Sequence, residues 1–177
     1  MTLLLTYILA ALLFSFLCSI AEAVILSITP AHIALLEKKG HPAAGKLQQL
    51  KRENNQPLAA ILTLNTIAHT VGAAGAGAQA TVVFGSGSIG VVSALLTLLI
   101  LVFSEIIPKT LGAYYWRELA PVTAQLLQLL VWLLSPFVLL SEKITARFAD
   151  EPMMSGMSRG EFQAISKLSE AEGQLSE

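Results

Sequence analysis

Charged side chains are scarce in this sequence and unevenly placed. Only 13% of its 177 residues are Asp, Glu, Lys or Arg, against roughly a quarter in an ordinary soluble domain. All 11 Lys and Arg residues follow residue 37, and none lies between residues 53 and 108. A soluble fold needs a charged surface, whereas a membrane protein confines charge to segments outside the lipid. The sequence therefore predicts an all-α integral membrane protein.

Three further features are missing. Cys18 is the single cysteine, so neither a disulfide framework nor a cysteine-based metal site is expected. The net charge of −1 gives no overall attraction to nucleic acid. No His-rich metalloprotease motif occurs, and the two carboxylates of the apolar segments, Glu22 and Glu105, fall on different predicted helices without an obvious nucleophile. We therefore expect neither a nucleic-acid partner nor an enzyme.

Three apolar segments are long enough to cross a bilayer as helices: residues 2–28, 57–84 and 89–107. The polar stretch between the first two, which extends to about Gln56, has the spacing of two short amphipathic helices lying along the membrane surface. It carries five basic residues, so the positive-inside rule places it in the cytoplasm. We expect a multi-pass protein of a bacterial plasma membrane, with its N-terminus outside and its C-terminus cytoplasmic.

Residues 120–141 form a fourth apolar stretch, which Ser135-Pro136 interrupts. A crossing there would carry the basic residues that follow it to the outside, against the charge rule. We therefore expect three crossings followed by a bent helix at or beneath the inner leaflet, and four crossings remain the alternative. The polar residues from 150 to 177 are predicted to form a cytosolic connector containing one short helix, at about residues 161–168.

Small residues fill the second half of the second apolar segment, from Gly72 to Ala80. In lipid, small side chains let helix backbones approach closely, and packing drives helix association. We expect this surface to pack against a neighbouring helix or against a second subunit.

Glu105 is the strongest candidate for a functional residue, because a carboxylate at membrane depth is costly. Pro108 follows three residues later, and a proline in a helix leaves the carbonyl four residues back, that of Ser104, without its usual donor. A carboxylate, a hydroxyl and a freed carbonyl are ligands that suit a hard cation. The alternative is that Glu105 only pairs with Lys109, four residues on.

Glu22 lies in the first apolar segment, with Ser19 and Ser15 one and two turns earlier. This polar stripe should face the interior of a helix bundle rather than lipid. Glu22 is either part of a functional site or only a partner for a neighbouring helix.

Asn65 and His69 share a face of the second apolar segment, one turn apart. The amide oxygen of Asn65 is a good neutral ligand for a divalent cation, while His69 is a better hydrogen-bond donor between helices. Three segments thus each offer one oxygen-bearing residue: Ser19, Asn65 and Glu105. One carboxylate with neutral oxygens is typical of a reversible divalent-cation site.

These residues resemble those of the CNNM/CorC family's membrane domain. The run Phe103–Thr110 is similar to that family's Gly-Glu-Ile-x-Pro-Lys signature, and Leu64-Asn-Thr66 is similar to its Gly-Asn-Thr. The stretch Phe16–Leu36 resembles its first helix, with matching positions at Ser19, Glu22 and Ser27. The likeness covers nearly the whole chain in the right order. Departures from the family pattern lie around the predicted ion site: Ser104, Leu64, Ala21 and His69.

The resemblance implies magnesium transport by a homodimer of three spanning helices with a juxtamembrane belt, usually followed by cytosolic CBS modules. It also implies a Mg²⁺ site on Ser19, Asn65 and Glu105. Glu22, Ser104, Ser27 and His69 are further candidates for this site. Residues 1–149 would then be the transporter domain, and residues 150–177 would lead toward a CBS pair. The hypothesis from another class is a membrane-embedded sensor or scaffold, which binds an ion without moving it.

Overall fold

The computed structural model describes residues 1–53 and 55–145, and every regular element in these ranges is helical. The short helix expected at residues 161–168 lies outside them. The longer elements, in chain order, are α1 (Thr2–Ser27), α2 (Pro30–Lys38), α3 (Ala43–Arg52), α4 (Asn55–Phe84), α5 (Ile89–Leu99), α6 (Ile107–Tyr114), α7 (Trp116–Leu133) and α8 (Ser135–Thr145). A 3₁₀ turn, η1 (Ser86–Ser88), follows α4, and a π-helical segment, η2 (Ile100–Ile106), joins α5 to α6.

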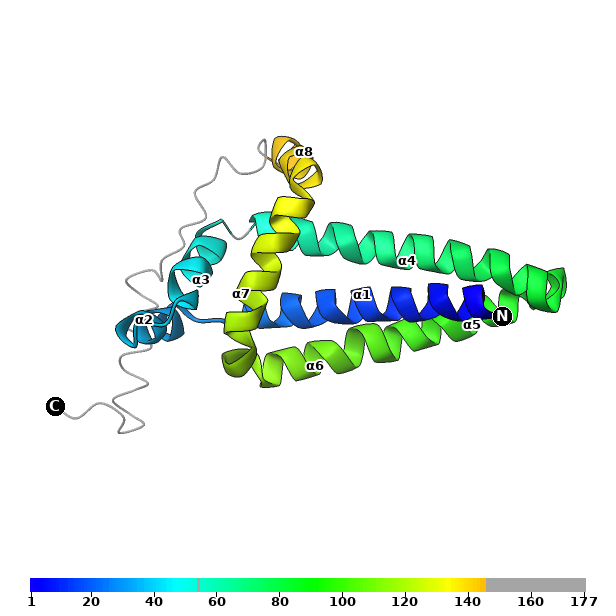
Figure 1. Ribbon diagram of the computed structural model, residues 1–177, viewed down its shortest axis with the longest axis horizontal. Coiled ribbons are helices and arrows are strands. Elements are labelled where there is room, and N and C mark those ends of the chain that lie inside the picture. Colours follow the sequence, from blue (N-terminus) through cyan, green and yellow to red (C-terminus); the bar gives the residue numbers. More distant parts are fainter. Residues whose placement is uncertain (54, 146–177) are drawn as a thin grey trace, which may run out of the picture. The chain divides into compact units, whose positions relative to one another are not determined.

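Three helices are long and apolar enough to cross a membrane: α1, α4 and the continuous helix over Ser86–Tyr114. Figure 1 shows them side by side, and α1 packs against both of the others. Within residues 1–142, the end of this bundle that holds Met1 and the turn at η1 is called the turn end, and the opposite end, crossed by α7, the α7 end. The prediction of an all-helical fold with three candidate spans is confirmed.

The loops between helices follow from local sequence. The hydroxyl of Thr29 accepts a hydrogen bond from the backbone N–H of His32 at 3.3 Å, which caps α2, and Pro30 occupies its first turn. Gly40 and Gly85 have positive φ values of 66° and 84°, a conformation that glycine adopts without strain. These residues therefore set the turns after α2 and α4. The two short helices expected between the first two spans are confirmed as α2 and α3.

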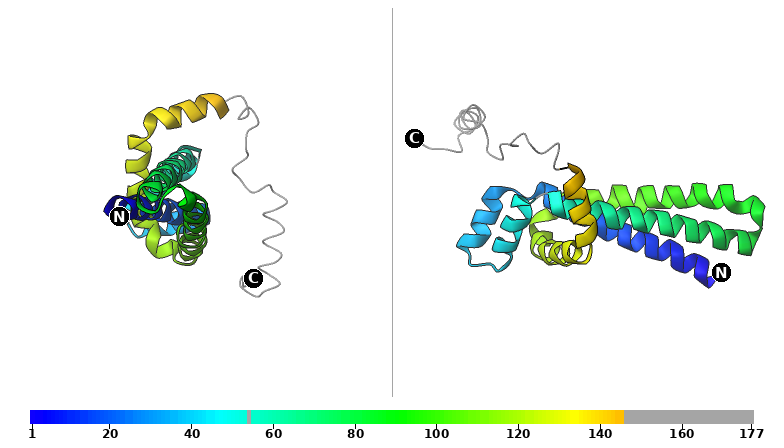
Figure 2. Two further views of the ribbon diagram at one scale, coloured as in Figure 1. Left: turned by 90° about the vertical axis from the view of Figure 1, so that its right-hand side faces the viewer. Right: turned by 90° about the horizontal axis from the view of Figure 1, so that it is seen from above.

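The fourth apolar stretch forms α7 and the start of α8, bent by 82° at a break beside Ser135. One side of α7 is fully buried against the bundle through Ala120, Ala124 and Leu127, whereas Trp132 is 73% exposed. Figure 2 shows α7 crossing the end of the bundle and α8 turning away from it. The bent helix is confirmed; counting the bent pair as one span would give four candidate crossings, so the number of crossings stays a prediction.

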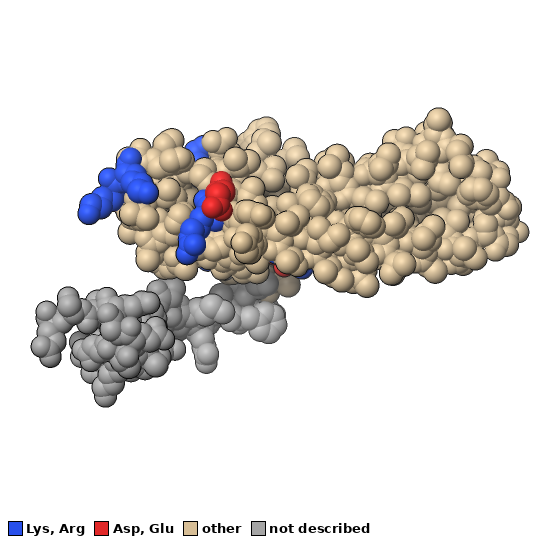
Figure 3. All heavy atoms as spheres, turned by 90° about the horizontal axis from the view of Figure 1, so that it is seen from below, with Lys and Arg blue, Asp and Glu red and all other residues tan. Residues whose placement is uncertain are grey.

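Apolar and charged residues separate along the bundle. Large apolar side chains such as Leu62, Val91 and Leu98 are more than half exposed on the three spans, as expected of surfaces that meet lipid. On the face drawn in Figure 3, charged side chains gather at the end that carries α2 and α3, and the spans are almost free of charge. The main buried core also lies toward this end, where residues of the second half of α1 form one apolar cluster with residues of α3, α4 and α7.

Candidate intramembrane ion site

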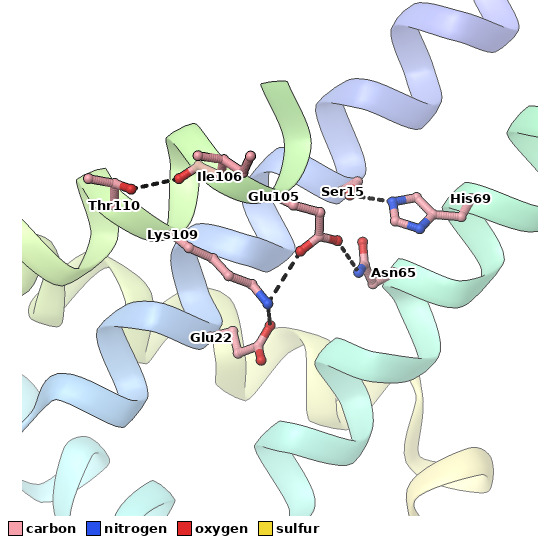
Figure 4. A network of polar contacts seen from close by, with 8 residues as sticks. All are labelled: Ser15, Glu22, Asn65, His69, Glu105, Ile106, Lys109 and Thr110. Carbon is pink, nitrogen blue, oxygen red and sulfur yellow. Dashed lines mark hydrogen bonds and ion pairs between the residues drawn. The ribbon is translucent and has the colours of Figure 1, made fainter. Parts of the chain in front are cut away.

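A connected set of polar side chains joins three helices near the α7 end of the bundle (Figure 4). The amide nitrogen of Asn65, on α4, donates to Glu105 Oε1 at 3.3 Å. The other carboxylate oxygen, Glu105 Oε2, lies 3.3 Å from Lys109 Nζ on α6. The same ammonium lies 3.2 Å from Glu22 Oε2 on α1. The chain Asn65–Glu105–Lys109–Glu22 is called the polar network below.

Helix geometry explains why these residues meet. Glu22 lies five residues before the end of α1, and Lys109 lies five residues before the end of α6. At about 1.5 Å of rise per residue, both are roughly 7–8 Å from the ends of their helices. Because α1 and α6 run in the same direction along the bundle and pack together, their last turns bring these two side chains to one level.

Two buried oxygens of the predicted ligands lack hydrogen-bond partners. They are Ser19 Oγ and Asn65 Oδ1, and the only other such side-chain atom within the described ranges is a nitrogen of His32. Ser19 is fully buried on α1, between Ser15 and Glu22. An unsatisfied buried polar atom costs about 1–3 kcal/mol, so each one calls for an explanation.

Ser15 and His69 form a second polar contact between α1 and α4, with 2.6 Å between Ser15 Oγ and His69 Nε2. Ser15 is fully buried, like Ser19, so the prediction that this stripe of α1 faces the bundle interior is confirmed for the two serines. The sequence indicates that both residues are polar groups within the bundle, but it does not predict that they pair. His69, which lies one turn from Asn65 on α4, is thus paired with a side chain of α1.

The segment before Pro108 is a π-helix rather than the simple proline break that the sequence suggests. Over η2 the backbone N–H of Ile107 donates to the carbonyl of Val102, five residues earlier. Such π segments often occur at functional sites. The helix continues to Tyr114, beyond the expected end at residue 107. The hydroxyl of Ser104 is fully buried and donates to the carbonyl of Leu12 at 3.2 Å, which ties η2 to α1.

The remaining candidate, Ser27, is not part of the network: its hydroxyl donates to the carbonyl of Ala23, one turn back in α1. The ion pair of Glu105 with Lys109, the alternative interpretation of that carboxylate, is present in the structure. Within residues 1–53 and 55–145, no group of three His, Cys, Asp or Glu side chains is placed to hold a metal ion. A cation here would therefore depend on neutral oxygens as well as carboxylates.

The fold and the network define a class: a polytopic helical membrane protein with carboxylate, amide and hydroxyl groups held between its spans. Residues 6–177 match the sequence profile of the CNNM family, described as the cyclin M transmembrane N-terminal domain. The chain belongs to this family, so the resemblance found from the sequence is confirmed.

Curated relatives are similar over the same region. The chain is 36% identical over 162 residues to the UPF0053 protein sll1254 of Synechocystis, covering 92% of this chain and 47% of that protein. It is 27% identical over 110 residues to the UPF0053 inner membrane protein YfjD of Escherichia coli, covering 62% of this chain and 26% of that protein. The chain thus spans less than half the length of these relatives.

Proposed function

We propose that this chain is the membrane domain of a divalent-cation transporter, with Mg²⁺ as its substrate. Ser19, Asn65 and Glu105 would supply oxygen ligands from α1, α4 and η2. The observation that carries the proposal is that Ser19 Oγ and Asn65 Oδ1, two of the three predicted ligands, are buried oxygens without hydrogen-bond partners. A hard cation is a partner that would satisfy both.

The position of these oxygens supports the same site. Asn65 already contacts Glu105 through its amide nitrogen, so its free oxygen lies next to the carboxylate. Ser19 lies on α1 between Ser15, which contacts α4, and Glu22, which is bridged to α6. Because the residues one turn before and one turn after Ser19 both reach other helices, its hydroxyl points into the bundle.

The ligand set suits transport better than tight storage. Mg²⁺ prefers six oxygens in octahedral geometry at about 2.0–2.1 Å and gives up its water slowly. One carboxylate and two neutral oxygens leave room for water molecules, which favours reversible binding. The family membership is consistent with this proposal, and a rocking motion of the bundle would release the ion.

The surroundings of the domain are proposals as well. The basic residues of α2 and α3 favour an N-terminus outside and these helices in the cytoplasm. Gly72 and Gly75 face α1, so a homodimer contact through the small residues of α4 would use its other side, where Ala74 and Ala78 are exposed. The greater length of the relatives leaves room for the cytosolic CBS pair that the resemblance implies.

Flux through liposomes tests the function. The chain is reconstituted into vesicles that contain a Mg²⁺-sensitive dye, and the initial rate is compared with that of Glu105→Gln. Because the substitution removes the charge of the site, we expect the rate to fall at least about tenfold, with 1.4 kcal/mol corresponding to each factor of ten. The matched control is Glu118→Gln on α7, which neutralises an exposed carboxylate away from the network and should leave the rate unchanged.

Each outcome decides between hypotheses. A Glu105→Gln rate equal to that of the unmodified chain would remove Glu105 from the mechanism. Mg²⁺ binding by calorimetry without any vesicle flux would support the sensor or scaffold hypothesis instead.

A further inference from the structure

Lys109 is the only Lys or Arg in the three candidate spans. Its ammonium lies 3.2 Å from Glu22 and 3.3 Å from Glu105, so it bridges two carboxylates from different helices. An ordinary pair between residues four apart on one helix would involve Glu105 alone. The second contact, with Glu22 on α1, indicates a role that concerns both acidic groups.

Charge counting shows that the ammonium and a divalent cation compete. Glu22, Glu105 and Lys109 together carry a net charge of −1. With Mg²⁺ added and Lys109 in place the sum is +1, whereas with Mg²⁺ bound and Lys109 withdrawn it is zero. Net charge at membrane depth is costly, so the neutral arrangement is favoured. Binding of the ion should therefore expel the ammonium.

The side chain of Lys109 is able to leave. It is 45% exposed, more than the 32% of Glu22 and the 25% of Glu105. Its long apolar stem can extend along α6 toward the near end of the helix, as lysines do when their charged group reaches the membrane surface. The carboxylate of Glu105 is instead held by Asn65 from the other side.

We propose that Lys109 is a tethered cation: it neutralises Glu22 and Glu105 while the site is empty, and a divalent cation must displace it to bind. This inference rests on the proposed function and adds its regulation. The built-in competitor lowers the affinity for Mg²⁺ and speeds release, because the returning ammonium replaces the departing ion. Lys109 acts here as a competitor of the ion, not as a ligand.

Calorimetric titration of the chain with Mg²⁺ tests the proposal. Lys109→Gln removes the competitor, so we expect the dissociation constant to fall at least about tenfold while vesicle flux at saturating Mg²⁺ decreases. Lys109→Arg keeps the positive charge and should bind within about threefold of the unmodified chain. Thermal unfolding without Mg²⁺ should show Lys109→Gln destabilised, because two carboxylates then face each other uncompensated, and Mg²⁺ should stabilise it more than it does the unmodified chain.

The failures are distinguishable. If the unmodified chain binds Mg²⁺ but Lys109→Gln binds it equally or more weakly, the tethered-cation proposal is overturned and the proposed function stands. If the unmodified chain neither binds nor moves Mg²⁺, the proposed function itself fails. If Lys109→Gln does not fold, the double variant Glu22→Gln/Lys109→Gln is used in its place. It keeps the net charge of the three positions 22, 105 and 109 at −1. This variant should bind Mg²⁺ more tightly than Glu22→Gln alone, and equal or weaker binding would contradict the proposal.

Discussion

The contact between α1 and α4 changes in character along its length. Toward the turn end, Gly72 and Gly75 lie so close to α1 that a Cβ on either would overlap Ala11 or the ring of Tyr7. Toward the α7 end, the two helices are joined by side chains, through the contact of Ser15 with His69 and through the polar network. One part of the pair is held by close backbone approach, and the other adds polar contacts to the main apolar core.

The two parts of the α1–α4 contact should therefore respond differently to Mg²⁺. Close packing of small residues is insensitive to ions and fixes the distance between two helices. Polar contacts at membrane depth can be remade when a charge arrives, because each partner can exchange one oxygen or nitrogen for another. We therefore expect substitutions near the turn end to change folding whatever the Mg²⁺ concentration, and substitutions in the polar network to change how folding depends on Mg²⁺.

The largest effect on folding is expected for Gly72→Leu. The new side chain would overlap Ala11 and the backbone of α1, so the helices must separate. Overpacking of this kind costs about 1–3 kcal/mol. The matched control is Gly90→Leu on α5, where a Cβ meets nothing within 4 Å. Unfolding in mixed detergent should show a lower free energy of unfolding for Gly72→Leu only, and the decrease should be the same without Mg²⁺ and at high Mg²⁺. Equal stability of the two variants would refute the close contact between the helices.

A smaller and Mg²⁺-dependent effect is expected for Asn65→Asp. The substitution removes the N–H group that donates a hydrogen bond to Glu105 Oε1, and it places a second carboxylate beside Glu105. Like charges at this distance should lower stability by about 2 kcal/mol without divalent cations. Mg²⁺ would bind both carboxylates, so the thermal midpoint should rise more with added Mg²⁺ than it does for the unmodified chain. Asn65→Leu is the control, because it loses the hydrogen bond but adds no charge. A deficit that Mg²⁺ leaves unchanged would show that Asn65 has only a structural role.

The sequence predicts the spans well, because long apolar runs leave no other stable arrangement in lipid. The first apolar run predicts a span over residues 2–28, and the helix is observed over Thr2–Ser27. The π-helical η2 could not be predicted, since its hydrogen-bond register has no signature in residue type. Pro108 indicated an irregular backbone without specifying which kind.

The candidate site was predictable residue by residue but not as a set of contacts. Helical spacing alone gives the pair Glu105–Lys109, because the two residues are four apart. The contact of Lys109 with Glu22 joins residues far apart in the chain, and only the packing of α1 against α6 brings them together. Helical spacing predicts that Ser15 belongs to a polar stripe, but its pairing with His69 depends on the rotation of α4, which residue spacing does not determine.

The smallest effect is expected where the two parts of the α1–α4 contact meet. Ser15→Ala removes the hydroxyl that lies 2.6 Å from His69 Nε2. Hydrogen bonds between membrane helices contribute about 0.6 kcal/mol on average and at most about 1.7 kcal/mol, so a loss of about 1 kcal/mol is expected. Ser27→Ala is the matched control for stability, because that hydroxyl bonds only within its own helix. If this contact belongs with the rigid part, the loss will be independent of Mg²⁺. A loss of stability that disappears at high Mg²⁺ would instead show that the ion-responsive region of α1 extends one turn beyond Ser19, toward the turn end of the bundle.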